Sequence, residues 1–379
     1  MGKLKELATV GSGDIIGNAL SAIFWFYLAS QIEPDAYGEL QWFIGIAGIF
    51  STIALFGNVN TITVYAVKNI QIQSTLNFIS LIASAILSLI IIIVFPAFYT
   101  IDIGILVIAY VINTLAVGDL LGRKQFSNYS KYTIIQKGLT LGLGLLFYHL
   151  FGYEAILFAL AFTYIFHLKR IISIFKNMKI NLSLVKERIG FITNNYVTFL
   201  ISGSIGAGQV DKIIIAPMLG FAILGNYSLG MQILSIMMIF TVIFYKYILT
   251  QDSSGVDLKK LKFLAILVSI LMAIGGIILG PIIIDTFFAK YVDTKIVIQI
   301  MSINVIPATI AYIFQSQLLG NEKSKTVLIS TGISLIVLLI STIILGLNFG
   351  IIGVAISLIM SSSTKVGVYL IEYIRRNTI

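Results

Sequence analysis

Three ionisable side chains lie inside long apolar segments of the sequence. Asp14 and Lys137 each lie several residues into such a segment, and Lys365 follows three consecutive serines in the last one. A charge inside a membrane costs a few kcal/mol and therefore has to face protein or water. A carboxylate there can exchange a proton or a sodium ion, whereas an ammonium group can bind an anionic head group. These three residues are therefore candidates for contact with an ion or a charged substrate.

Each of these residues also has a purely structural interpretation. Asp14 and Lys137 lie at similar depth, so they could pair with each other rather than with a ligand. The long side chain of Lys365 could carry its ammonium group to the inner surface of the membrane. The sequence leaves both interpretations open.

Two of the apolar segments carry polar residues along one helical face. In the seventh segment the spacing of three or four residues joins Asn195, Thr198, Ser202, Gly206 and Gln209. In the first segment the same spacing joins Asp14, Asn18 and Ser21. Two such faces would line a hydrated cleft if they were opposed. The alternative is that small polar residues only hold helices together, which is common in membranes.

The sequence offers little for catalysis or metal binding. It has no cysteine, and its two histidines, His149 and His167, lie at opposite faces of the predicted membrane. No histidine cluster has the spacing of metal ligands, and no phosphate-binding loop is present. We therefore predict no enzyme, no metal and no cofactor. Any energy for transport would come from an ion gradient, with H+ or Na+ as the coupling ion, or from substrate supply.

About twelve apolar segments are long enough to cross a bilayer, which needs roughly 20 mostly apolar helical residues. They run approximately over 8–30, 39–66, 75–96, 103–122, 132–150, 154–168, 189–218, 220–246, 261–286, 296–319, 325–346 and 349–374. The sequence therefore predicts an all-α polytopic membrane protein.

Lysine and arginine residues fall nearly all on one side of the predicted membrane. If the N-terminus is cytoplasmic, only Lys212, Lys290 and Lys295 lie on or near the outer side. This asymmetry predicts that both termini are cytoplasmic and that the protein is a multi-pass protein of the cell membrane. The net charge of +9 then reflects topology and contact with anionic membrane lipid rather than nucleic-acid binding.

The longest polar stretch divides the chain near its middle. Residues 169–188 combine basic residues with apolar residues at helical spacing, which is typical of an interfacial linker helix. We predict a six-helix lobe at 1–168, a cytoplasmic basic amphipathic linker at 169–188, and a six-helix lobe at 189–379. A weak repeat supports this division, because residues 28–38 align with 215–225 in their small and apolar positions and in the final glycine. Such repeats predict two pseudo-symmetric lobes around a central cavity.

Two short motifs resemble a known family of transporters. The stretch YLASQIEPDAYGEL at 27–40, followed by a helix that ends in Phe56 and Gly57, is the first. The second is QVDKIII at 209–215, followed by LGNYS at 224–228. Both are similar to the oligosaccharide (O-antigen type) flippases of the polysaccharide biosynthesis group. That group belongs to the multidrug, oligosaccharidyl-lipid and polysaccharide exporter superfamily. The chain lacks room for a thirteenth and a fourteenth helix, which the lipid II flippase branch is expected to carry.

The resemblance implies a flippase that moves a polyprenyl (di)phosphate glycan from the inner to the outer leaflet for cell-surface polysaccharide assembly. Lys137, Lys212 and Lys365 would attract its anionic head group, and Asp14, Asn18, Asn195, Ser202, Gln209 and Asp211 complete the candidates for the cavity. The implied partners are the lipid-linked oligosaccharide, membrane lipid, and glycosyltransferases or a polymerase of the same pathway.

Two other functions stay open. The first is an ion-coupled multidrug exporter of the same superfamily, in which Asp14 would bind the coupling ion. The second is a membrane polysaccharide ligase or polymerase. The short outer connections argue against the latter, because such enzymes would be expected to present acidic catalytic residues in a larger external region.

Overall fold

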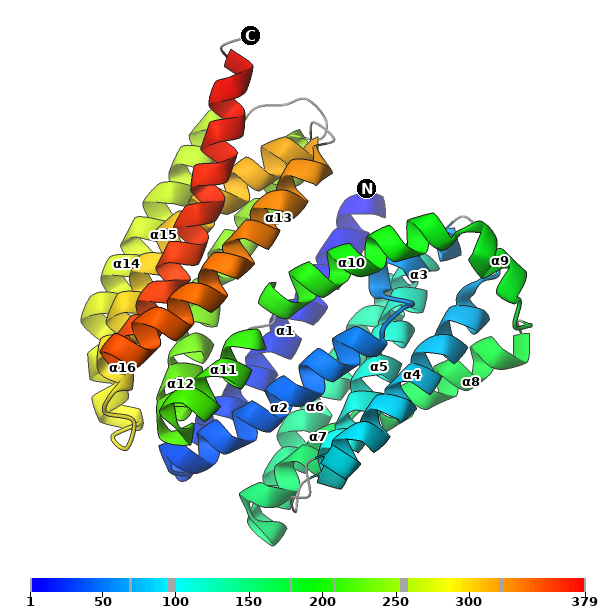
Figure 1. The fold of residues 1–379 in the computed structure, drawn as a ribbon, viewed down its shortest axis with the longest axis horizontal. Coiled ribbons are helices and arrows are strands. Elements are labelled where there is room, and N and C mark those ends of the chain that lie inside the picture. The colour runs from blue at the N-terminus through cyan, green and yellow to red at the C-terminus, as the bar shows by residue number, and fades with distance from the viewer. Residues whose placement is uncertain are drawn as a thin grey trace. The chain divides into compact units, whose positions relative to one another are not determined.

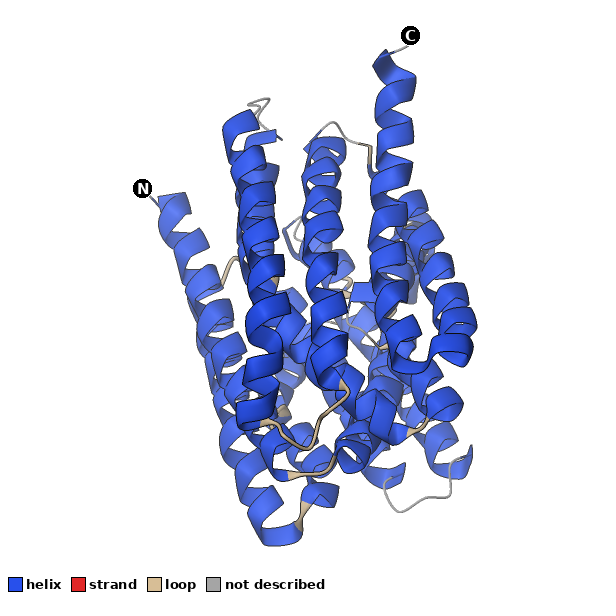
Figure 2. Cartoon of the chain, turned by 90° about the vertical axis from the view of Figure 1, so that its left-hand side faces the viewer, coloured by secondary structure: helices blue, strands red, loops and turns tan. Residues whose placement is uncertain are grey.

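The computed structural model describes residues 2–67, 70–94, 100–177, 179–206, 209–252, 258–320 and 323–377, and every regular element in these ranges is helical (Figure 2). Contacts group the chain into two compact units. Unit 1 comprises Met1–Leu28 and Phe43–Gln209, and unit 2 comprises Ala29–Trp42 and Val210–Ile379. The helices α1 (Gly2–Gln31) and α2 (Pro34–Ala54) run through both units (Figure 1). The predicted all-helical membrane fold is confirmed.

Unit 1 contains the helices up to residue 206. They are α3 (Val59–Val67), α4 (Gln73–Val94), α5 (Thr100–Gly122), α6 (Phe126–Phe151), η1 (Tyr153–Ala155), α7 (Ile156–Phe162), η2 (Ile165–His167), α8 (Leu168–Asn177), α9 (Leu182–Glu187) and α10 (Ile189–Gly206). The predicted linker thus forms two short helices, α8 and α9. Asn181 caps α9 through its side chain, which accepts hydrogen bonds from the backbone N–H groups of Ser183 and Leu184.

Unit 2 contains six helices in addition to the outer parts of α1 and α2. They are α11 (Val210–Leu219), α12 (Phe221–Met237), α13 (Ile239–Asp252), α14 (Lys259–Phe287), α15 (Thr294–Gly320) and α16 (Ser324–Asn377). Gly350 interrupts α16 with φ of 58°, a backbone conformation that glycine adopts without strain. The two halves then lie side by side, because Thr342 bonds Ser357 at 2.8 Å and Ser361 donates to the Ser334 carbonyl at 2.8 Å. These halves correspond to the last two predicted spans.

Seven helices in the described ranges are long and apolar enough to cross a membrane, or eight if the bent pair α12 and α13 forms one span. Three of the predicted spans each fold as two consecutive helices. The chain breaks between α2 and α3, between α10 and α11, and between α12 and α13. Apart from α2, which has 21 residues, each of these helices is shorter than the roughly 20 residues that a bilayer needs. Length and composition alone therefore identify fewer spans than the sequence pattern predicts.

Helix α4 shows how these helices are oriented toward lipid. Its serines at 80, 84 and 88 are buried, whereas Leu89 and Ile93 are exposed, by 59% and 76%. The buried Ser88 hydroxyl donates to the Gly104 carbonyl of α5 at 2.8 Å. Small polar residues inside and large apolar residues outside reverse the pattern of a soluble protein. This distribution fits a multi-pass membrane protein.

The boundaries of the two units fall at other residues than those of the predicted lobes. Helix α10 packs in unit 1, where the Tyr196 hydroxyl donates to the Ile53 carbonyl at 2.5 Å and the Tyr196 ring stacks on Phe56. The outer ends of α1 and α2, residues 29–42, pack instead in unit 2. The division of the transport cycle into lobes 1–168 and 189–379, joined by 169–188, stays a prediction.

Candidate functional site

Helices α1 and α6 pack closely in unit 1, and this contact positions Asp14. A β-carbon on Gly13 would lie 2.4 Å from the Ser130 hydroxyl, and one on Gly17 would lie 3.1 Å from Thr133. Two glycines four residues apart therefore allow the helices to approach each other. In this seam the half-buried Asp14 carboxylate accepts a hydrogen bond of 2.7 Å from the Tyr129 hydroxyl.

Lys137 lies one turn farther along the same seam. The Gly17 β-carbon position is 3.3 Å from its Cγ, so the aliphatic part of the side chain packs on α1. Among the described residues none forms a hydrogen bond or ion pair with its ammonium group, and Asp14 is not its partner. A half-buried cation without a protein partner is unfavourable unless water or a ligand compensates it.

The polar residues predicted to form one face of the seventh span have different environments in the structure. Asn195 is half-buried and donates to the Phe191 carbonyl of its own helix at 2.9 Å. Ser202 belongs to α10, but its side chain lies outside the described part of the chain. Gln209 follows α10 and packs on α2, where its Cδ is 2.7 Å from the β-carbon position of Gly48. Asn18, on α1, is exposed.

In unit 2 the candidates Asp211 and Lys212 begin α11. Asp211 is buried and accepts hydrogen bonds from the Tyr227 hydroxyl and from the backbone N–H of Lys212. The Lys212 ammonium group donates to the Gln41 amide oxygen at 2.9 Å. These bonds hold the beginning of α11 against α12 and α2. Both residues therefore have structural partners inside the protein.

The first turns of α2 and α12 cross at two glycines that the internal repeat aligns with each other. A β-carbon on Gly38 would lie 1.8 Å from the Phe221 carbonyl oxygen, and one on Gly225 would lie 1.9 Å from that of Pro34. Each glycine thus faces the carbonyl four residues before the other, which is a reciprocal, pseudo-twofold contact. Only glycine permits so close an approach of two backbones.

Further contacts surround this crossing on the predicted outer side. The Tyr291 hydroxyl donates to the Ile32 carbonyl at 3.3 Å, and the Tyr291 ring packs edge-on against Tyr37. Lys290 forms an ion pair of 2.9 Å with Glu33. These contacts join residues 29–42 to the remainder of unit 2.

Lys365 lies in the second half of α16 and is half-buried. In the described part of the chain, no residue forms a hydrogen bond or an ion pair with it. One turn before it, the Ser361 hydroxyl bonds the first half of the same element. The structure thus places Asp14 and Lys137 in one seam of unit 1, and Lys365 apart from Asp211 and Lys212 in unit 2.

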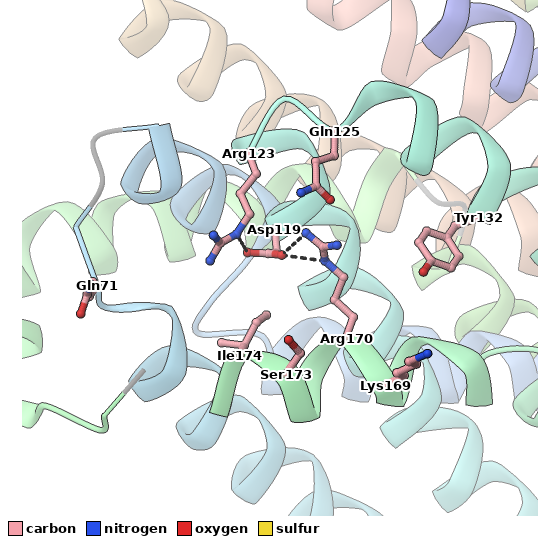
Figure 3. A pocket seen from close by; sticks show the side chains of 9 residues that line it. All are labelled: Gln71, Asp119, Arg123, Gln125, Tyr132, Lys169, Arg170, Ser173 and Ile174. Carbon is pink, nitrogen blue, oxygen red and sulfur yellow. Dashed lines mark hydrogen bonds and ion pairs between the residues drawn. The ribbon is translucent and has the colours of Figure 1, made fainter. Parts of the chain in front are cut away.

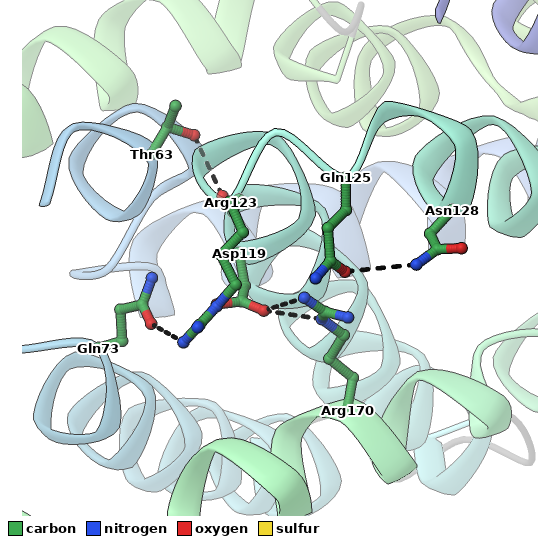
Figure 4. A network of polar contacts seen from close by, with 8 residues as sticks. Thr63, Gln73, Asp119, Arg123, Gln125, Asn128 and Arg170 are labelled. Atoms are coloured by element: carbon green, nitrogen blue, oxygen red, sulfur yellow. Dashed lines mark hydrogen bonds and ion pairs between the residues drawn. The ribbon is translucent and has the colours of Figure 1, made fainter. Parts of the chain in front are cut away.

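Sequence reasoning missed a buried polar network at the C-terminal end of α5 (Figure 4). Asp119 accepts from Arg123 at 2.7 Å and from Arg170 of α8 at 2.6 and 2.7 Å. Arg123 also donates to the Gln73 amide oxygen at 3.2 Å. One sequence feature could have indicated this network: Asp119 lies four residues before Arg123 at the end of an apolar span. The positive-inside rule alone already accounts for an arginine at this position.

A second missed network lies in unit 2. The Asp252 carboxylate accepts from Lys262 at 2.7 Å and from the Ser316 hydroxyl at 2.5 Å, and so joins α13, α14 and α15. In the described ranges, no group of three or more His, Asp or Glu side chains is arranged to hold a metal ion. Both networks pair a carboxylate with lysine or arginine.

Comparison with solved structures identifies the fold. An inward-facing multidrug resistance MATE family transporter of the MOP superfamily matches with a TM-score of 0.69 at 12% identity, covering 96% of this chain and 94% of that one. The lipid II flippase MurJ in an inward closed conformation matches with a TM-score of 0.74 at 15% identity, covering 98% and 87%.

A MOP superfamily transporter from Pyrococcus furiosus, described as having a binding pocket of reverse polarity, gives a TM-score of 0.55 at 13% identity and covers 98% and 93%. No protein-family model matches the sequence, and no curated protein matches it. The chain therefore shares the fold of MOP superfamily transporters over nearly its whole length.

Proposed function

We propose that this protein is a MOP superfamily flippase rather than an enzyme. It moves a polyprenyl (di)phosphate glycan from the inner to the outer leaflet of the cell membrane, with both termini in the cytoplasm. The shared fold supports transport, and the two motifs at 27–40 and 209–215 favour a lipid-linked oligosaccharide as the substrate. Glycosyltransferases would supply this substrate, and a polymerase would consume it.

The environment of Lys137 is the observation that favours an anionic substrate. Its ammonium group is half-buried beside α1 and has no partner among the described residues. A diphosphate head group would provide the missing anion and accept charge-assisted hydrogen bonds. Lys365 in unit 2 has the same property and is the second candidate for such a contact.

In the proposed mechanism the protein alternates between an inward-open and an outward-open state. The contacts of residues 29–42 with α12 and with Lys290 and Tyr291 hold the predicted outer ends of the first two helices in unit 2. In the proposed cycle these contacts separate when the outer side opens. The glycine crossing contributes packing without interlocking side chains, so separation would cost little side-chain rearrangement.

The first test is Lys137→Ala in a host that depends on this protein for surface glycan. We expect surface glycan to fall by about tenfold, because one charge-assisted contact contributes about 1.5–3 kcal/mol. Lys131→Ala is the matched control, since Lys131 is an exposed lysine on the same helix, and it should behave as the wild type. Lys137→Arg should restore part of the transport. Normal surface glycan in Lys137→Ala would refute the assignment of Lys137 to the head group.

An ion-coupled multidrug exporter is the second candidate function. The observation that favours it is the half-buried Asp14 carboxylate, which the Tyr129 hydroxyl positions inside unit 1. A MATE family transporter is also among the structural matches. Asp14→Asn removes the charge and keeps the size. If Asp14→Asn abolishes efflux of a cationic dye while Lys137→Ala leaves surface glycan intact, the exporter replaces the flippase.

A further inference from the structure

A cavity of about 510 Å³ lies in unit 1 beside the Asp119 network (Figure 3). It is formed where the end of α5, the beginning of α6 and helix α8 meet. This is the side of unit 1 that the distribution of basic residues predicts to be cytoplasmic. None of the residues proposed for transport lines the cavity. Its volume is in the range of sites that bind small molecules, about 300–1,000 Å³.

The lining of this cavity has an excess of positive charge. Arg123, Arg170 and Lys169 contribute three cations, and Asp119 is the single carboxylate among the lining residues, which leaves a net charge of +2. The Asp119 side chain is only 2% exposed, and each of its oxygens already accepts from a guanidinium group. Its negative charge is therefore paired with the two arginines, while Lys169 has no such partner among the described residues.

Asp119 also fixes the orientation of the two arginines. Arg170 uses its Nε and Nη2 atoms for Asp119, and Arg123 uses Nε for Asp119 and Nη2 for Gln73. A guanidinium group carries five N–H donors, so each arginine keeps unused donors. In Figure 3 Arg170 and Lys169 project from one helix, α8, and the Ser173 hydroxyl lies on the same helix.

Two further features preorganise the cavity. Lys124 adopts a φ of 56° after the end of α5, and this left-handed turn directs the chain so that both Arg123 and Gln125 line the cavity. A lysine in this conformation costs about 1–2 kcal/mol. The Tyr132 ring is held by stacking on Phe166, with 5.4 Å between ring centroids. The donors around the cavity are therefore positioned before any ligand arrives.

We propose that this cavity binds the phosphate group of an anionic ligand, held by Arg123, Arg170 and Lys169. Arginine presents a planar set of donors that matches phosphate oxygens, and lysine adds a point charge. The phosphate belongs either to a membrane lipid head group or to a soluble ion. Basic pockets between helices on the cytoplasmic side of membrane proteins bind lipid head groups in this way. The inference does not depend on the proposed transport function.

A direct binding experiment tests the site. The purified full-length protein is reconstituted in nanodiscs of phosphatidylcholine alone, and binding of inorganic phosphate is titrated by calorimetry. In a second arm, increasing fractions of phosphatidylglycerol replace phosphatidylcholine, and retention of this lipid is measured by mass spectrometry. Binding in the first arm identifies a soluble phosphate, and binding only in the second identifies a lipid head group.

Lys169→Gln is the diagnostic variant, because Lys169 is exposed and forms no hydrogen bond or ion pair with any described residue. We expect about a tenfold loss of affinity with an unchanged melting temperature, since one charged contact is removed. Lys176→Gln is the matched control: Lys176 is exposed on the same helix and does not line the cavity. It should bind as the wild type does.

Two results would overturn the proposal. One is no saturable binding in either arm, which would leave the Asp119 network as a purely structural link between α5 and α8. The other is an equal loss of affinity in Lys169→Gln and Lys176→Gln, which would indicate diffuse attraction to a basic surface. Ser173→Asp provides a second check, because it places a carboxylate in the lining. The proposed site requires that this variant also lose binding.

Discussion

Each unit contains a buried ionic network that joins several helices, and the two networks differ in charge balance. In unit 2, one carboxylate, Asp252, meets one lysine, Lys262, and a serine, and both charged side chains are at most 10% exposed. In unit 1, one carboxylate, Asp119, meets two arginines next to an exposed lysine and a cavity. A balanced, closed pair serves packing, whereas an unbalanced network beside a cavity can receive an anion.

The contact between the beginnings of α2 and α12 is symmetric, in contrast to the two networks. Gly38 and Gly225 occupy equivalent positions of the internal repeat and make reciprocal contacts with Phe221 and Pro34. Pseudo-symmetry is therefore visible at this crossing in unit 2, whereas the two ionic networks have different compositions.

The largest expected effect comes from breaking the closed pair in unit 2. Lys262→Ala leaves the buried Asp252 carboxylate with the Ser316 hydroxyl as its one remaining partner among the described residues, and should destabilise the protein by about 3–5 kcal/mol. The loss would be measured as a lower melting temperature of the purified protein in detergent. The double variant Lys262→Met with Asp252→Asn should recover most of it, because no charge is then left unpaired.

The comparison predicts that Lys169→Gln, at the unbalanced network of unit 1, leaves the melting temperature unchanged. If Lys262→Ala melted at the wild-type temperature, the Asp252 pair would not be a closed structural unit. The contrast between the two networks would then fail.

The second prediction concerns the symmetric glycine crossing. Gly38→Ala and Gly225→Ala each place a methyl group within 2 Å of a backbone oxygen, so the two helices have to move apart. Overpacking of this kind costs about 1–3 kcal/mol. Because the contact is reciprocal, we expect both variants to have similar effects.

The cysteine-free sequence allows this separation to be measured. Cysteines introduced at Glu33 and Lys290, whose side chains form an ion pair of 2.9 Å, report the closure of the outer side through a short bifunctional thiol reagent. Cross-linking should fall in both glycine variants and should be unaffected by Gly142→Ala, where an added β-carbon meets nothing within 4 Å. A large effect of one glycine and none of the other would contradict the pseudo-twofold contact.

Much of the fold was predictable because apolar length and the basic residues carry the signal along the chain. The breaks inside predicted spans were not, because a helix interruption such as the one between Ala54 and Val59 changes hydrophobicity very little. Asp14 and Lys137 stand out in the sequence as costly charges, and in the structure Asp14 accepts a hydrogen bond from Tyr129 on α6. Tyr129 lies 115 residues after Asp14, so the sequence around Asp14 does not reveal this hydrogen bond.

The networks at Asp119 and Asp252 were missed for a related reason. Arg123 and Lys262 lie at the ends of spans, where a basic residue already satisfies the topology rule. Arg170 and Gln73 in the first network and Asp252 in the second come from other helices, and one-dimensional patterns do not show which helices are neighbours. The Asp119 pair with Arg123, four residues apart on one helix, was the one part of either network that spacing could have revealed.

The smallest expected effect tests whether the turn at Lys124 is strained in order to build the cavity. Lys124→Gly relieves a left-handed lysine, which costs about 1–2 kcal/mol, but adds the backbone entropy of glycine, about 0.4–1 kcal/mol. The net gain in unfolding free energy should be about 0.5–1 kcal/mol, visible as a small rise in melting temperature. Anion binding should not change, because the Lys124 side chain does not line the cavity and Arg123 and Gln125 keep their positions.

Lys124→Ala is the control, since alanine removes the same side chain but keeps the strain, and it should not stabilise the protein. A gain in Lys124→Ala equal to that in Lys124→Gly would assign the effect to lost charge repulsion among Arg123, Lys124 and Lys169 instead of to the backbone.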